Sequence, residues 1–582
     1  MKVPPSGLPA PERLVVDVVV VGSGAAGLMA VRHATDADPD LRVALISKGL
    51  VGRSGCSVMA QGLNAALGAD DSPVAHFEDI VRGGSFLSDQ ALAWTLAVDA
   101  PLVVRELADQ VGCAFDREPG GSIALASFAG QSRDRKVHRG HVTGLEIVSR
   151  LRDDLLRTRP TILEDTRALD LLTDDRGVTG LLVLDIRRGV PIVLTAPVVV
   201  LAAGGSAAAS YRVATPAREK AGDGLALAAR AGVPLRDMEM VQFLSVGLAA
   251  GASKLTGALL EEALRFAGAE LLNGRGERFM PRYDADRAER APRDVVARAS
   301  WEEIADGRGT PDGGVLLDCR PIGRERLAAR FRDLVDRAAL VGVDLATAPV
   351  PIAPAAHIGI GGVVIDPDGA TELPGLLVAG EDAGGVHGAS WTGGNGIAES
   401  SVFGRRAGRA AAALARERTA PPPASSEATA GRLASASAPL TSEVGTETPG
   451  GLARELGGVL WDLVGLRRDA AGLATAATRI EALRDRSRRA RVSGPARANG
   501  AWQEALDLAS RLEVAELVVA AATARTESRG VHLRSDAPQR DDAAWLRAVH
   551  VRRGPGGVET ASVPVVLDRL RPDAPVAAEA SR

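Results

Sequence analysis

Aromatic side chains are scarce in this sequence: Phe, Trp and Tyr together make up 3% of its 582 residues. Cysteine is scarcer still, and Cys56, Cys113 and Cys319 lie far apart, without the paired spacing of a zinc or iron–sulfur site. No sign of charge dominates, because 69 Lys and Arg residues balance 73 Asp and Glu residues, for a net charge of −4. We therefore expect a reducing compartment, no bound metal and no nucleic-acid partner.

Long apolar runs are also missing. No run approaches the ~20 residues that a bilayer-spanning helix needs, so we expect no transmembrane segment. The first residues, MKVPPSGLPAPERL, contain no apolar core of the kind found in secretory signal peptides. The composition thus favours a cytoplasmic protein, and its length allows two to four domains.

One glycine-rich stretch stands out among the residues that are present. The hexapeptide GSGAAG follows the apolar run Val15–Val21, which predicts a buried strand, and precedes a helical pattern. In this context Gly22 permits a tight turn, Gly24 lets the backbone approach a pyrophosphate, and Gly27 lets the helix pack on the strand. The N-terminus of the helix then offers free N–H groups to the phosphates. The predicted dinucleotide contacts are Gly22, Gly24, Ala25, Ala26 and Gly27.

The second predicted strand, residues 42–47, ends in Ser47-Lys48. Dinucleotide-binding folds often carry an acidic residue here, which bonds a ribose hydroxyl. Ser47 can still bond a ribose, but the missing carboxylate argues against a simple NAD site.

The order of strand, glycine turn and helix predicts an α/β protein with a Rossmann-like domain in two pieces, residues 14–240 and 351–418. The arginine-rich residues 241–350 are irregular and predict an inserted capping domain. Residues 419–450 have the composition of a linker. Residues 451–582 predict a C-terminal helical domain.

A series of short motifs resembles, in order, the flavoproteins of the succinate dehydrogenase, fumarate reductase and L-aspartate oxidase superfamily. The matching stretches are GSGAAG (22–27), AQGLNAALG (60–68), GQS (130–132), LAAGG (201–205), GDG (222–224), RGERFMPRY (275–283), RDVVAR (293–298), HIGIGG (357–362), LLVAGE (376–381), HGASWTGGN (387–395) and ESRGVH (527–532).

The resemblance implies bound FAD. Glu381 corresponds to an acid that bonds the ribitol or ribose, and Asp223 corresponds to a residue near the adenosine half; a helix-capping carboxylate is the alternative for both. The loop from Arg53 to Gly62 would line the isoalloxazine. The histidine that tethers FAD covalently in the respiratory enzymes aligns with Gly55, so we expect noncovalent FAD. Further expected cofactor contacts are Ser47, Lys48, Ser54, Gly62 and Asn395.

The resemblance also implies a catalytic set. Arg293 corresponds to the acid/base arginine, and Glu262 and Arg265 correspond to its proton relay. Because an arginine is always protonated, it can donate a proton only where a relay restores it. The alternative for these three residues is an interface salt bridge. His357 corresponds to a substrate-carboxylate ligand, or is a structural hydrogen-bonding residue.

Two positions depart from the pattern. Leu244 follows Gln-Phe where the superfamily has a histidine, and Trp391 stands where it has an arginine clamp. Losing a charged clamp removes about 1.5–3 kcal/mol per hydrogen bond. These residues therefore predict a substrate with one carboxylate, or with a larger apolar or aromatic part on Trp391.

Three functions follow from the sequence. The first is FAD-dependent dehydrogenation or reduction of a small carboxylic acid by hydride transfer at flavin N5, acting on CH–CH or CH–NH groups. The second is an L-aspartate oxidase or a fumarate reductase whose clamp comes from other arginines. The third is a flavin-bearing electron-transfer subunit of a complex, with an iron–sulfur subunit or another acceptor as its partner.

Overall fold

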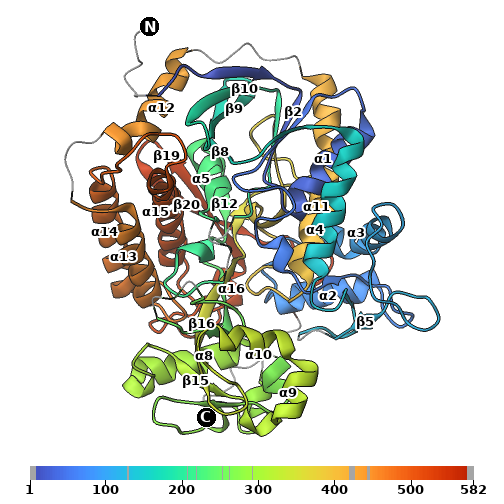
Figure 1. Ribbon diagram of the computed structural model, residues 1–582, viewed down its shortest axis with the longest axis vertical. Helices are drawn as coiled ribbons and strands as arrows, with labels where there is room; N and C mark the ends of the chain where they lie inside the picture. The colour runs from blue at the N-terminus through green and yellow to red at the C-terminus, as the bar shows by residue number, and fades with distance from the viewer. Residues whose placement is uncertain are drawn as a thin grey trace.

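The computed structural model describes residues 8–572 except for 128–129, 206, 216, 218, 252, 254, 261–262, 292, 419–425 and 442–445. Figure 1 shows an upper body built around parallel strands, with the segment from about 250 to 350 at the bottom and the C-terminal helices along the left side. Glu262 of the predicted relay lies outside the described residues.

A five-stranded parallel sheet forms the centre, in the order β18-β11-β2-β3-β7. Its strands β2, β3, β11 and β18 are runs of Val, Leu, Ile and Ala that are buried throughout, as expected for a parallel sheet covered on both faces. The strands are β2 (Val18–Val21), β3 (Val43–Ile46), β7 (Thr161–Leu163), β11 (Val198–Leu201) and β18 (Leu376–Val378).

The prediction of one strand over Val15–Val21 is wrong at its start. Asp17 interrupts the run and forms an ion pair with Arg42, 2.6 Å between Oδ1 and Nη2. Val15 belongs to a separate strand, β1 (Glu12–Val15), and is 47% exposed. A carboxylate that must stay solvated therefore ends one strand before the next begins.

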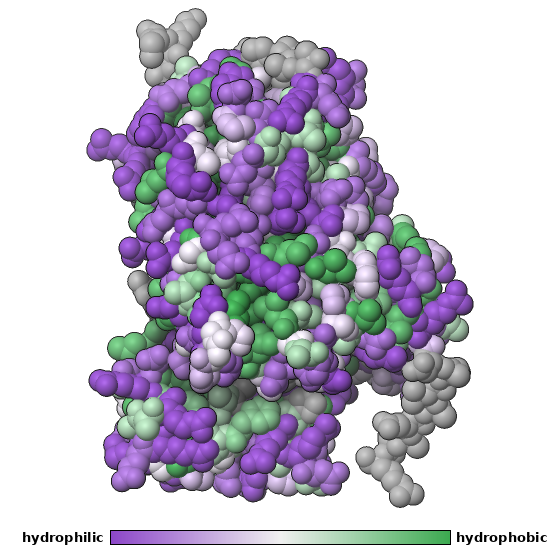
Figure 2. All heavy atoms as spheres, turned by 90° about the vertical axis from the view of Figure 1, so that its right-hand side faces the viewer, coloured by the Kyte–Doolittle hydropathy of each residue, from purple (hydrophilic) through white to green (hydrophobic). Residues whose placement is uncertain are grey.

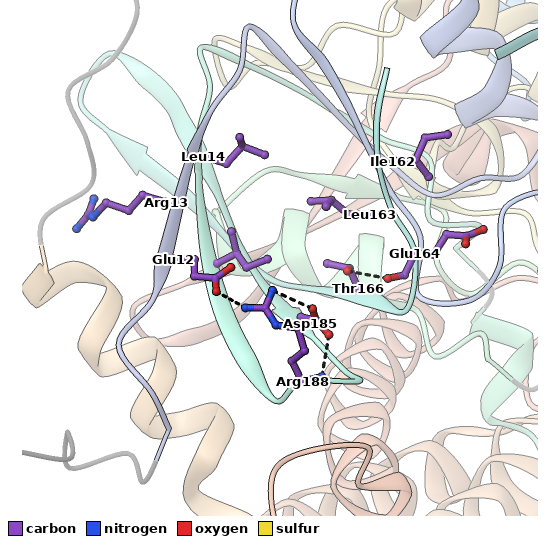
Figure 3. Close-up of a pocket in the computed structure, with 10 residues that line it drawn as sticks. Glu12, Arg13, Leu14, Ile162, Leu163, Glu164, Thr166, Asp185 and Arg188 are labelled. Atoms are coloured by element: carbon purple, nitrogen blue, oxygen red, sulfur yellow. Dashed lines mark hydrogen bonds and ion pairs between the residues drawn. The ribbon is translucent and has the colours of Figure 1, made fainter. Parts of the chain in front are cut away.

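Strand β1 joins a second sheet, in the order β1-β10-β9-β8. Its other strands are β8 (Thr166–Asp174), β9 (Gly177–Asp185) and β10 (Val190–Thr195). A depression lies between this sheet and β7 of the central sheet. Figure 3 shows Arg188 at its wall, where it forms ion pairs with Glu12 and Asp185. None of the predicted site residues lines it.

Two helices pack on one another beside the central sheet, α1 (Ala25–Ala37) and α11 (Asn395–Glu417). Glycines allow the close approach, because a Cβ on Gly404 would lie 2.3 Å from the Ala26 carbonyl oxygen and one on Gly408 would lie 2.3 Å from that of Ala30. The first turns of α1 are thereby packed against the middle of α11.

The inserted region has its own antiparallel sheet, in the order β13-β16-β15-β14, and its own apolar core. Strands β13 (Val241–Leu248) and β16 (Val350–Gly359) pair with each other in this sheet, so most of β16 comes from the residues predicted for the Rossmann-like domain. The other elements are β14 (Glu270–Leu272), β15 (Val315–Asp318), α6 (Ala263–Phe266), α7 (Met280–Tyr283), α8 (Arg293–Glu303), α9 (Arg324–Arg330) and α10 (Arg332–Ala339).

The C-terminal region is less purely helical than predicted. Helices α13 (Pro449–Leu463), α14 (Ala470–Ser487) and α15 (Gly500–Ala524) form its body, and the one-turn α16 (Asp542–Trp545) follows. Strands β19 (Arg547–Gly554) and β20 (Gly557–Pro564) then form a hairpin that pairs with β12 (Leu235–Arg236), which also pairs with β17 (Gly362–Val363). The predicted linker 419–450 contains a helix, α12 (Ser426–Thr441), whose Leu433 is buried.

Four of the scarce aromatic residues gather where the three regions meet. Tyr211 and Phe243 lie 5.3 Å apart, Phe243 and Trp461 6.1 Å, and Trp461 and Trp301 5.2 Å, measured between ring centroids. Trp301 comes from α8 of the inserted region and Trp461 from α13 of the C-terminal region. Such rings bury large apolar areas, so this cluster joins the regions into one body.

Three further helices cover the right side in Figure 1: α2 (Pro73–Gly83), α3 (Gln90–Asp109) and α4 (Thr143–Thr158). Figure 2 shows this face, where polar side chains surround a central apolar area. On this side α4 packs on the turn Ser57–Met59, and the exposed apolar residues there are Met59, Val142 and Leu145. The helices of the described ranges are each too short or too polar to cross a bilayer.

Candidate functional site

The glycine turn after β2 has no room for side chains. Gly22 has φ +106°, and a Cβ there would lie 2.0 Å from the Ala202 carbonyl oxygen at the end of β11. A Cβ on Gly27 would lie 1.8 Å from the Gly22 carbonyl oxygen. The first and third glycines of the motif therefore have the roles predicted for them, a left-handed turn and close helix-to-strand packing. The N-terminus of α1, with Ala25 and Ala26, points its N–H groups beyond this edge of the sheet.

Three serines extend the cradle around Gly24. Ser23 Oγ lies 2.8 Å from Ser47 Oγ at the end of β3. The Ala25 amide donates to Ser57 Oγ over 3.1 Å, and a Cβ on Gly24 would lie 3.0 Å from the same oxygen. Ser47 thus lies beside the glycine turn, where a ribose hydroxyl is expected.

An ion-pair cluster occupies the predicted adenosine end. Lys48 Nζ lies 2.8 Å from an Asp223 carboxylate oxygen and 3.1 Å from one of Asp507. Arg167 bridges the same two carboxylates, at 2.5 Å from Asp223 and 2.6 Å from Asp507. Burial opposes ionisation of Asp223, but Arg167 and Lys48 outweigh it and hold its pKa below the ordinary range. Ser510 adds a hydroxyl that donates to Asp223.

At the opposite end, Glu381 forms a buried ion pair. Its Oε2 lies 2.7 Å from Lys220 Nζ, and its Oε1 accepts a hydrogen bond from the Gly359 amide over 3.2 Å. Burial raises the pKa of Glu381 against the pull of Lys220. The Cys56 thiol lies near the same ammonium group, and burial raises its pKa too. The high thiol pKa fits a packed cysteine rather than a reactive one.

Asp382, next to Glu381, ties two sheet strands together. It accepts hydrogen bonds from the backbone amides of Ala203 and Gly205, which follow β11. Asp382 itself lies in the segment that follows β18. Burial raises its pKa to about 6. The acid therefore keeps the carboxyl ends of β11 and β18 in register.

The loop that the resemblance assigns to the isoalloxazine runs from Arg53 to Gly62. Ser54 uses its hydroxyl to bond the Leu50 carbonyl oxygen over 2.9 Å. Gly55 has φ +84°, and a Cβ there would meet no atom within 4 Å. A Cβ on Gly62 would lie 2.3 Å from Lys136 Cγ, so Gly62 lets this lysine pass across the loop.

Asn395 opens α11 and is 1% exposed. Its Oδ1 accepts hydrogen bonds from Asn64 Nδ2 over 2.8 Å and from His76 Nε2 over 3.0 Å. Its side-chain oxygen thus fixes the first turn of α11 to α2 and β4 (Leu63–Asn64). A contact of Asn395 with the cofactor stays a prediction.

Three of the predicted catalytic and substrate residues come together. The Arg293 guanidinium lies 5.7 Å from the centroid of the Trp391 ring, and the His357 ring lies 5.3 Å from that centroid. Arg293 is the first residue of α8, His357 lies near the end of β16, and Trp391 precedes α11. The inserted region and the Rossmann-like domain therefore meet at these three side chains.

His357 is a neutral imidazole. Burial, together with the positive charges of Arg293 and Lys220, lowers its pKa to about 3. Its Nδ1 lies 2.6 Å from Thr215 Oγ1. A neutral ring with one nitrogen engaged can offer the other as a single hydrogen-bond donor, but not as a cation.

Arg265 lies in the one-turn helix α6 and reaches the segment that leads into α8. It is 2% exposed and donates through Nη1 to the carbonyl oxygens of Glu289 and Ala291, the second of these over 3.5 Å. Ala291 is two residues before Arg293. The structure thus brings Arg265 next to the backbone that carries Arg293, while its role in proton transfer stays a prediction.

Leu244 is buried on β13, opposite Ala355 of β16. Gln242, two residues earlier, accepts a hydrogen bond from the Trp391 backbone amide over 3.1 Å. The loop before Trp391 is also supported by the C-terminal region, since the Val531 amide donates to the Ala389 carbonyl oxygen over 2.9 Å.

Sequence reasoning missed several residues of these clusters, among them five that contact a predicted site residue or the backbone beside it. Lys220 and Asp382 adjoin recognised motifs, and each could have been noticed as a charged residue beside a glycine turn. The others come from segments with no motif, so only the tertiary structure reveals them. The five are Arg167, Thr215, Lys220, Asp382 and Asp507.

The residues present fit FAD. The cradle around Gly22 and Gly27 excludes side chains where a pyrophosphate would pass, and the carboxyl ends of β2, β3, β11 and β18 carry polar groups on both sides of it. This is the edge at which open α/β sheets bind dinucleotides. Within the described ranges, no cluster of His, Cys, Asp and Glu could hold a metal ion.

Comparison with known proteins gives the same assignment. The FAD binding domain family matches residues 17–397, and the family described as fumarate reductase flavoprotein C-term matches residues 453–577. In the fumarate reductase (CoM/CoB) of Methanothermobacter marburgensis, one subunit is 38% identical to this chain, over 92% of this chain and 97% of its own length. The fumarate reductase flavoprotein subunit of Mycobacterium tuberculosis is 34% identical over 96% of this chain and 98% of its own.

Solved structures agree in fold. Quinol fumarate reductase of E. coli has a TM-score of 0.89 at 31% identity, covering 97% of this chain and 98% of that one. Sdh1 of Mycobacterium smegmatis has a TM-score of 0.88 at 35% identity, covering 96% of both chains. The chain belongs to the fumarate reductase and succinate dehydrogenase flavoprotein family, and it is an FAD-dependent oxidoreductase.

Proposed function

We propose that this protein dehydrogenates a small carboxylic acid, or reduces the corresponding unsaturated acid. The observation that carries the proposal is the meeting of Arg293, His357 and Trp391 between the inserted region and the Rossmann-like domain. Bound FAD supplies hydride exchange at its N5.

Arg293 is the proton donor or acceptor in this proposal. A guanidinium is protonated at all working pH values, so it needs a relay, for which we propose Glu262 and Arg265. The hydrogen bond from Arg265 to the Ala291 carbonyl oxygen supports this arrangement, because it holds the backbone before Arg293. Arg293 also contributes the positive charge that attracts a carboxylate.

The substrate is proposed to carry a single carboxylate. His357 is neutral and can donate one hydrogen bond, while Leu244 and Trp391 supply apolar and aromatic surface. Arg293 as a cation and His357 as a neutral donor match one carboxylate, which supports a substrate with a single carboxylate. An unsaturated or aromatic part can stack on Trp391.

A flavin-bleaching screen of the purified yellow protein tests this function. We expect single-carboxylate acids to bleach or reoxidise the flavin faster than succinate, fumarate or aspartate. Arg293→Lys should lower turnover by about 10²–10⁴-fold, the usual contribution of a positioned acid or base. Unchanged turnover in this variant would refute the acid/base role. Dicarboxylate turnover that survives Trp391→Ala would favour an ordinary fumarate reductase or an aspartate oxidase instead.

We further propose that the FAD is noncovalent. Gly55 offers no atom to bond the flavin, in a loop position where a side chain would have space. Acid precipitation should therefore release all yellow colour into the supernatant. A pellet that keeps its flavin would contradict the proposal and point to another tether.

A second candidate function is electron transfer within a complex, since the relatives above are named as subunits. Met59 in the loop from Arg53 to Gly62 exposes an apolar side chain, as do Val142 and Leu145 at the start of α4, which packs on this loop; this favours a partner protein there. An iron–sulfur subunit is the proposed partner, and a cytoplasmic location stays a prediction. Affinity purification from native cells, with iron and sulfide measured, tests for this partner. If the chain purified alone and without iron, the result would argue against an iron–sulfur partner.

A further inference from the structure

Lys220 lies where three loops meet at the carboxyl edge of the central sheet. Its Nζ is 2.7 Å from Glu381, which follows β18. Its Cε lies 2.7 Å from the place a Cβ on Gly204 would take, in the turn after β11. Its ammonium also interacts with Cys56, in the loop after β3. These are the loops that surround a dinucleotide in this fold.

The lysine is buried, with 7% of its surface exposed. Burial opposes its charge, but the ion pair with Glu381 favours it, and the pKa of Lys220 is raised above its ordinary value, so it stays a cation. Its positive charge also acts on His357, at the proposed substrate site. The positive charge of Lys220 therefore acts both on Glu381, at the expected cofactor site, and on His357, at the proposed substrate site.

Two buried acids, Glu381 and Asp382, lie near Lys220, and its positive charge affects how readily they are protonated. Burial raises the pKa of Glu381 and of the adjoining Asp382, so without the lysine these two acids would hold protons more readily. Lys220 holds one oxygen of Glu381 and the Gly359 amide holds the other. Charges close to a flavin ring tune its redox chemistry.

We propose that Lys220, in its ion pair with Glu381, is a cofactor-site cation that raises the reduction potential of the bound FAD. Two-electron reduction of flavin with uptake of one proton adds one negative charge to the ring system. A buried cation next to the cofactor stabilises that added charge, and the low local dielectric makes the effect larger than in water. Glu381 acts in the opposite sense, so the pair sets the potential between them.

Four variants measured by dye-equilibrated flavin titration test this inference, with FAD affinity measured in parallel. Lys220→Met should shift the reduced-to-oxidised ratio at a fixed potential at least tenfold toward oxidised flavin, about 30 mV for a two-electron couple. Glu381→Gln should shift the ratio the other way. Lys220→Arg keeps the charge and should stay close to the unmodified protein, and the double variant Lys220→Met with Glu381→Gln should lie between the two single ones.

A purely structural lysine would behave differently. In that case Lys220→Met would weaken FAD binding but leave the potential unchanged, which overturns the proposal. If Lys220→Met fails to load FAD, Glu381→Gln decides: a raised potential supports the inference and an unchanged or lowered one overturns it. Both measurements need no substrate, so the outcome is independent of whether the proposed carboxylic acids are turned over.

Discussion

At the scale of single residues, Thr215 decides how His357 can act. The imidazole is neutral, with its pKa lowered to about 3, so only one ring nitrogen carries a proton. The Thr215 hydroxyl, 2.6 Å from Nδ1, can donate to that nitrogen, and we assign the proton to Nε2 on this basis. His357 would then present a donor to the substrate carboxylate.

Replacing Thr215 with Val removes that hydroxyl at almost constant volume. We expect the KM for the active acid to rise about tenfold, because one hydrogen bond to a charged group contributes about 1.5 kcal/mol, with a smaller change in kcat. Thr215→Ser keeps the hydroxyl and should restore the KM. Steady-state kinetics check this, and equal KM values for the Val and Ser variants would show that the tautomer does not depend on Thr215.

At the scale of elements, the contact between α2 and α11 makes stability depend on pH. His76 is 1% exposed and donates from Nε2 to Asn395 Oδ1, and burial lowers its pKa to about 4 from an ordinary 6.5. As the pH falls below about 6.5, the unfolded chain takes up this proton first. The folded state therefore loses stability between pH 6.5 and 4.

The His76→Gln variant should be less sensitive to acid than the unmodified protein. The histidine accounts for about 3 kcal/mol of lost unfolding free energy at pH 4, at about 1.4 kcal/mol per pKa unit. Denaturant unfolding at pH 7 and pH 4 measures this difference in unfolding free energy. Gln is chosen because its side-chain amide can still donate a hydrogen bond to Asn395. Asp382, with its pKa raised to about 6, changes stability in the opposite sense in both proteins and cancels in the comparison. Equal pH dependence would contradict the prediction.

At the scale of the whole molecule, the C-terminal region takes part in the cofactor site. Asp507 and Ser510 of α15 reach Lys48 and Asp223 at the predicted adenosine end. Arg167 of β8 links both acids, so two regions far apart in sequence share one ion-pair cluster. FAD retention should therefore depend on how the C-terminal helices are docked.

Asp507→Asn should weaken FAD binding and lower the melting temperature, because it leaves Lys48 and Arg167 short of a partner in a buried site. The expected loss of stability is about 3 kcal/mol or less, since the Asp507 side chain is 19% exposed. Glu504→Gln, an exposed change of the same charge on the same helix, is the control. Identical FAD dissociation constants in the two variants would contradict this coupling.

The sequence was sufficient for the family, the cofactor and the identity of most local elements. Gly22 and Gly27 are dictated by local geometry, so a short motif reveals them, and the superfamily motifs identify Arg293, His357 and Trp391 one by one. The sequence also misplaced features: Asp17 divides a run read as one strand, α12 occupies a segment read as linker, and the C-terminal region ends in a β-hairpin.

The sequence by itself determined that this chain binds a dinucleotide, because a strand, a glycine turn and a helix N-terminus are adjacent along the chain. Only the tertiary structure decided how charge is arranged around that cofactor. Lys220 with Glu381, and Lys48 with Asp507, pair across 161 and 459 positions of the chain. Electrostatic pairing depends on distance in space and on burial, and neither is written in the spacing of residues.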